Sequence, residues 1–136
     1  MTHAEIEKLE DLFLKCEMKK EFWTHEAHFV VATCILFKNP SINILPLLRN
    51  LIRRNNIFMG IQNTEDAGYH ETITWLYIKE IQKVLAGKIH ITKAEAVQEV
   101  LKSAIVVKDY PLRFYSKELL FSKKARATVI HPILSA

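Results

Sequence analysis

The stretch THEAHFVVATCILFK, residues 24–38, decides the fold. Thr24 is a favoured helix N-cap residue, and nearly every position from 29 to 37 is apolar. A helix that is apolar nearly all round is one that other elements cover on all sides. Asn39-Pro40 ends it, because the residue before a proline disfavours the helical backbone. The stretch therefore predicts a central, buried helix with the rest of the chain packed around it.

Four further helices are indicated by start and stop signals on either side of this stretch. They are a first helix capped by Thr2, a third capped by Asn43 with Pro46 in its first turn, a fourth from about residue 69 to 86 before Gly87, and a fifth from the Thr92/Glu95 capping box to about residue 104. Residues 111–120 predict a short extra helix, and the last dozen residues an extended strap. Strand-type alternation is nearly absent, apart from a short stretch at 89–91. The predicted fold is all-α, an antiparallel bundle of four to five main helices.

The composition fits one helical domain over residues 1–136, with 49% hydrophobic and 25% charged residues and a net charge of +4. Charges of both signs are interspersed, which argues against a nucleic-acid partner. We interpret the one basic cluster, Lys117, Lys123, Lys124 and Arg126, as a solvated face. The longest apolar run, residues 29–37, is about half of a membrane span, and no secretory-type opening is present. A cytoplasmic protein without a membrane partner is expected.

Two phrases of the chain are built alike: Trp23-Thr24-His25-Glu26-Ala27-His28 and Gly68-Tyr69-His70-Glu71-Thr72-Ile73-Thr74. Each places a His-Glu pair at the start of a predicted helix. In an up-down bundle the second and fourth helices point the same way, so their first turns lie at one end of the molecule. We therefore expect His25, His28 and His70 to come together there.

Three converging imidazoles with a carboxylate would suit a catalytic divalent metal ion, either zinc, manganese or iron. His25 and His28 are three residues apart and share a helix face, and His70 would supply the third ligand. Glu26 or Glu71 would then act as general base or hold a ligand in place. The His-x-x-His spacing is one residue short of the zinc-protease arrangement, so peptidase chemistry is not indicated.

A second interpretation of the same end of the bundle needs no metal. Helix N-termini favour anions, and Arg53 or Arg54 would help them to hold a small polar or anionic molecule while His28 or His70 moves a proton. The remaining side chains expected to contact or orient this ligand are Trp23, Asn56, Asn63, Tyr69 and Thr74.

The leading function is therefore a small-molecule enzyme or binding protein, metal-dependent and hydrolase- or lyase-like if the ion is bound. In the competing interpretation the His-Glu pairs are only helix-start devices. The chain would then be a non-enzymatic interaction module that binds a partner or forms a homodimer through Ile105-Val106-Val107 and Ile130.

The two His-Glu phrases, together with Asn63-Thr64 and the segment Tyr115-Ser116-Lys117-Glu118-Leu119-Leu120-Phe121-Ser122, resemble a family of small bacterial all-helical proteins of uncharacterised activity. The resemblance covers the chain from about residue 22 onward and implies a helical fold and one shared signature. The size and helix content are also similar to the DinB-like three-histidine bundles. In those proteins a single histidine precedes an i, i+4 pair, so the analogy is architectural only.

Overall fold

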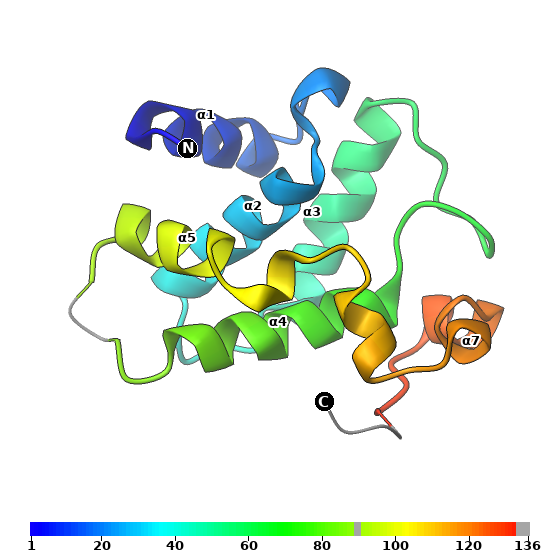
Figure 1. Cartoon of the computed structure of the whole chain (residues 1–136). Helices are drawn as coiled ribbons and strands as arrows, with labels where there is room; N and C mark the ends of the chain where they lie inside the picture. The colour runs from blue at the N-terminus through cyan, green and yellow to red at the C-terminus, as the bar shows by residue number, and fades with distance from the viewer. Residues whose placement is uncertain (89–90, 133–136) are drawn as a thin grey trace.

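The computed structural model describes residues 1–88 and 91–132, and within them all regular structure is helical. The five main helices are α1 (His3–Leu14), α2 (His25–Lys38), α3 (Leu45–Phe58), α4 (Glu71–Leu85) and α5 (Lys93–Leu101), packed against one another (Figure 1). The predicted all-α class is thus confirmed. Residues 89–90 of the expected short extended stretch lie outside the described residues.

Most helix starts follow the predicted local signals. Thr2 and Thr92 each form a capping box, and the Thr24 hydroxyl accepts a hydrogen bond from Ala27 N. The third helix differs by one residue: Ile44 occupies the cap position, and the Asn43 side chain accepts from Leu45 N. The fourth begins at Glu71 rather than near residue 69, because the ring of His70 serves as its cap.

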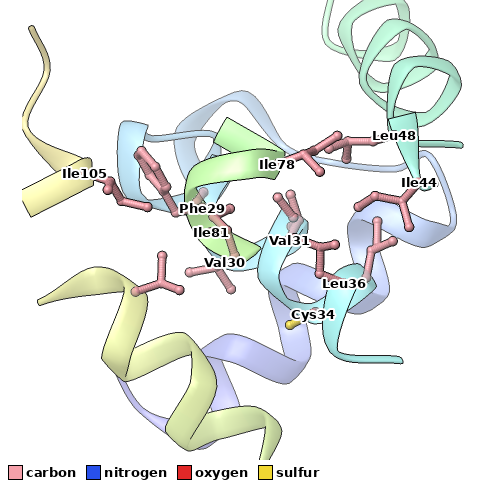
Figure 2. Close-up of a cluster of buried hydrophobic side chains, with 14 of the residues drawn as sticks. Phe29, Val30, Val31, Cys34, Leu36, Ile44, Leu48, Ile78, Ile81 and Ile105 are labelled. Atoms are coloured by element: carbon pink, nitrogen blue, oxygen red, sulfur yellow. The ribbon is translucent and has the colours of Figure 1, made fainter. Parts of the chain in front are cut away.

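The predicted central helix is confirmed by its burial: α2 contacts α1, α4 and α5. Val30, Val31 and Cys34 are buried in the cluster that Figure 2 shows, with Ile78 and Ile81 of α4 beside them. Each fully buried side chain of this size stabilises the fold by about 1.5–3 kcal/mol. Figure 1 shows α2 and α4 running in the same general direction, as expected.

The chain after α5 forms several short helical pieces, where the sequence predicted one short helix over residues 111–120 and then a strap. They are η2 (Ala104–Val106), η3 (Tyr110–Arg113), α6 (Lys117–Leu120) and α7 (Lys123–Ala127); η1 (Lys20–Phe22) is a similar piece before α2. The strap begins only after α7, because Ser122 caps that extra helix. Thr72 Oγ1 then donates to the carbonyl of Thr128 and accepts from Ile130 N, which fastens the strap to α4. In this way α7 is brought against α4.

Among the described residues, no helix is long and apolar enough to cross a bilayer.

Candidate functional site

The residues predicted to form one site do not come together: some line one cavity beside α4, some line a second, and others line neither. His25, His28 and Thr74 line a cavity of about 270 Å³, here called the histidine cavity. Arg53 and three other predicted residues, Asn63, Tyr69 and Glu71, line a second cavity of about 610 Å³, here called the basic cleft. Helix α3 borders both, because consecutive side chains on an α-helix project about 100° apart, so that neighbouring rows face different cavities. Leu48 and Ile52 line the histidine cavity, whereas Arg49 and Arg53 line the basic cleft.

The histidine cavity lies between α2, α3 and α4 and is walled mainly by hydrocarbon. The apolar lining side chains are Phe29, Ala32, Leu48, Ile52, Ile73, Ile78, Ile81 and Pro111. Its polar lining is confined to His25, His28, Thr74, Tyr77 and Lys108. The surface is therefore that of a small-molecule pocket, with an apolar body and a few polar groups.

Backbone carbonyls fix the orientation of both histidines in this cavity. His25 Nε2–H donates to the carbonyl of Val106, and His28 Nδ1–H donates to the carbonyl of Thr24. The nitrogen-to-oxygen distance is 2.7 Å in each bond. A carbonyl only accepts, so these bonds assign the proton in the neutral rings and leave His25 Nδ1 and His28 Nε2 as acceptors. Neither of these nitrogens is hydrogen-bonded to another described residue.

His28 is a neutral ring near neutral pH, and its Nε2 can accept a hydrogen bond. Its ring reaches solvent, but it also lies against Trp23, with the ring centroids 3.8 Å apart. Partial burial lowers the pKa of His28, although its bond to Thr24 acts in the opposite direction. Trp23 in turn stacks on Phe13 of α1. Trp23 therefore supports the imidazole and lines neither cavity.

Tyr77 and Lys108 belong to the histidine cavity although neither was among the predicted site residues. The Tyr77 ring packs edge-on against Phe29, and burial raises the pKa of its hydroxyl, so this group stays a hydrogen-bond donor. Its sequence signal is the i, i+3 spacing from Thr74 on α4. Lys108 follows η2 in an irregular segment, where no periodic pattern indicates which way a side chain faces.

His70 does not join the other two histidines, contrary to the expectation from the sequence. Its Nδ1 accepts from Ile73 N at 3.1 Å, and its Nε2–H donates to the carbonyl of Leu120 at 2.7 Å. The side chain is 8% exposed, and burial lowers its pKa. One ring nitrogen thus caps α4, and the other ties α4 to α6. Among the described residues, no three His, Cys, Asp or Glu side chains are grouped so as to hold a metal ion.

Neither predicted carboxylate lines the histidine cavity. Glu26 is exposed in the first turn of α2 and lines neither cavity. Glu71 is buried at the edge of the basic cleft, where the Arg49 guanidinium donates to both its oxygens and the Tyr69 hydroxyl donates to one. Burial would raise the pKa of Glu71, but these bonds hold it below its usual value. The carboxylate is therefore ionised and fully engaged.

The two predicted asparagines hold the loop between α3 and α4. Asn63 Oδ1 accepts from Asn56 Nδ2 at 2.9 Å and from Tyr69 N at 3.1 Å, while Asn63 Nδ2 donates to the carbonyl of Arg53. Their amide groups are thus used within the protein rather than on a ligand. The segment from Asn63 to Glu71 accordingly encodes a hydrogen-bonded turn and the start of α4.

Comparison of the chain with protein-family models, with curated proteins and with solved structures finds no match. The family resemblance drawn from the two His-Glu phrases stays a prediction.

Proposed function

We propose that this protein binds a small amphipathic molecule in the histidine cavity and that His28 accepts a proton from its polar group. One observation carries the proposal: a mainly hydrocarbon cavity is lined by two imidazoles, each oriented by a bond to a backbone carbonyl and each left with one acceptor nitrogen. Such pre-oriented acceptors lose little conformational freedom when a ligand binds.

The side chains that line the cavity favour a more specific ligand than the small polar or anionic molecule expected from the sequence. Phe29 and Ile81 offer contact to an apolar body. His25 and His28 accept a hydrogen bond from a hydroxyl group, and Lys108 attracts negative charge on the ligand. A cavity of about 270 Å³ falls at the small end of ligand sites. We infer a hydroxy acid with a short hydrocarbon body, whose hydroxyl group donates to the imidazoles.

If the protein is an enzyme, this geometry supports hydrolase- or lyase-like chemistry with His28 as general base. The proposal does not require a metal ion, because a catalytic zinc usually has three protein ligands and this cavity offers two imidazoles. Zinc, manganese or iron stays a prediction. Elemental analysis of untagged protein, purified without chelators beside His25→Ala and His28→Ala, tests it.

The interaction-module alternative loses part of the surface on which it was based. Ile105 is 5% exposed, because η2 packs against α2, α4 and α5. Val107 of the predicted segment is exposed, and so are other apolar side chains, among them Ile57 and Phe58 at the end of α3. A homodimer stays a prediction, and light scattering at several protein concentrations measures it.

Filling the histidine cavity should abolish ligand binding. Ala32 lines the cavity, so in Ala32→Leu the added carbons occupy the volume that the ligand needs. We expect short-chain hydroxy acids to cause saturable shifts in the amide NMR signals of Phe29, Thr74 and Tyr77 in the native protein, and none in Ala32→Leu. His28→Ala should weaken binding by about tenfold, the effect of roughly 1.4 kcal/mol lost with one hydrogen bond.

His3→Ala is the matched control, since His3 lies exposed at the start of α1 and lines neither cavity. Binding that needs neutral His28 should weaken as the pH falls through the lowered pKa of this residue. Shifts that persist unchanged in both Ala32→Leu and His28→Ala would contradict the proposal.

A further inference from the structure

The basic cleft concentrates positively charged side chains in one concave part of the surface. Arg49 and Arg53 of α3 line it on one side, and Lys123, Lys124 and Arg126 of α7 on the other. Only two carboxylates, Glu65 and Glu71, share the lining with these five cations. Lys123, Lys124 and Arg126 belong to the cluster that the sequence suggested to be a solvated face. In the structure they lie across the cleft from the arginines of α3.

The two carboxylates of the cleft do not neutralise most of this positive charge. Glu71 is neutralised by its two-pronged bond to Arg49. Glu65 is 77% exposed and lies 3.3 Å from Lys123, which is itself 66% exposed, so this ion pair is weak. Arg53, Lys124 and Arg126 form no ion pair with any described residue.

Two guanidinium groups of the cleft are held in place before any ligand arrives. Arg126 Nη1 donates to the carbonyl of Gly68 at 3.0 Å, and Arg49 is fixed by Glu71. Both keep further N–H groups that no described residue accepts. A fixed guanidinium fork matches the oxygens of a phosphate group, and less entropy is lost when it binds.

We propose that the basic cleft binds a small phosphate ester, with Arg53, Lys124 and Arg126 contacting the phosphate oxygens. Several cations that share few carboxylates suit a dianion better than a single carboxylate group. The volume of about 610 Å³ and the walls formed by α3, α7 and residues 63–65 suit a small molecule rather than an extended polymer. This site is separate from the histidine cavity, for which a different ligand is proposed.

Inorganic pyrophosphate is the probe that tests the proposal on the full chain. We expect calorimetry and amide NMR to report saturable binding, with shifts at Thr64, Lys124 and Arg126. Arg53→Gln should weaken binding five- to tenfold, because it removes one charge from the cleft without breaking a bond that its side chain makes to a described residue. Glu65→Gln should tighten binding about threefold, since it removes an exposed negative charge beside Lys123.

Lys20→Gln and Glu17→Gln are the matched controls, since both side chains are exposed and neither lines the cleft. They should leave pyrophosphate binding unchanged. Equal affinities of Arg53→Gln and Lys20→Gln would overturn the proposal, as would the absence of saturable binding. Affinity for a single-stranded oligonucleotide that rises with its length and exceeds that for pyrophosphate would overturn it too, in favour of a nucleic-acid face.

Discussion

Replacement of Gly68 by alanine is expected to lower the free energy of unfolding by about 3–5 kcal/mol, because two costs add at this position. A Cβ built on Gly68 would lie 2.2 Å from the carbonyl oxygen of Gln62 and 2.8 Å from Asn63 Oδ1. Its φ of +81° is also a conformation that residues with a side chain rarely adopt. The clash involves backbone and the amide that holds the loop, so nothing nearby can move aside cheaply.

Gly60→Ala is the matched control for this prediction. Gly60 has the same φ of +81°, but a Cβ there meets nothing within 4 Å. It should therefore cost only the conformational strain, about 1–2 kcal/mol. Urea unfolding followed by circular dichroism measures both variants. Equal losses would show that the close approach of residues 62 and 63 to Gly68 does not occur.

The helices could be predicted from sequence because their signals are local. Thr2 and Thr92 find their partner glutamates three residues away, and α2 needs only its own apolar run to be recognised as buried. The extra helix α7 could not be separated from the strap, since a five-residue helix has almost no periodicity to detect. Its stability depends on packing against α4 rather than on its own sequence.

The candidate sites were predictable only where the residues share one helix. His25 and His28 were grouped correctly because i, i+3 neighbours on a helix are close whatever the rest of the chain does. His70 was assigned to the same group from topology alone. Its true partner is the carbonyl of Leu120, and no local pattern shows that residues 117–127 fold over the start of α4. The same long-range packing creates the basic cleft.

His70→Ala should lower the free energy of unfolding by about 2–4 kcal/mol, because it removes a helix cap and a buried tether and leaves a void. Ile73 N and the carbonyl of Leu120 each lose their partner.

His70→Asn should cost less, since asparagine can cap α4 but is too short to reach Leu120. His28→Ala, at an exposed position, should change stability by no more than about 0.5 kcal/mol. Equal stability of His70→Ala and His28→Ala would contradict the structural role of His70.

The pH dependence of stability separates this role from simple packing. Burial lowers the pKa of folded His70, so the unfolded chain binds a proton more readily than the folded one. The stabilisation is complete above the unfolded pKa of about 6.5 and is lost as the pH falls toward the folded pKa, at up to about 1.4 kcal/mol per pH unit.

Urea unfolding between pH 7 and 5 should show this slope in the native protein and a smaller one in His70→Asn. The remainder comes from His28, whose pKa is lowered too, while the engaged carboxylates Glu10 and Glu71 act only at lower pH. His3→Asn, altered at an exposed site, should keep the full slope. If the slope is unchanged in His70→Asn, then His70 is not held as the neutral ring that its two hydrogen bonds require.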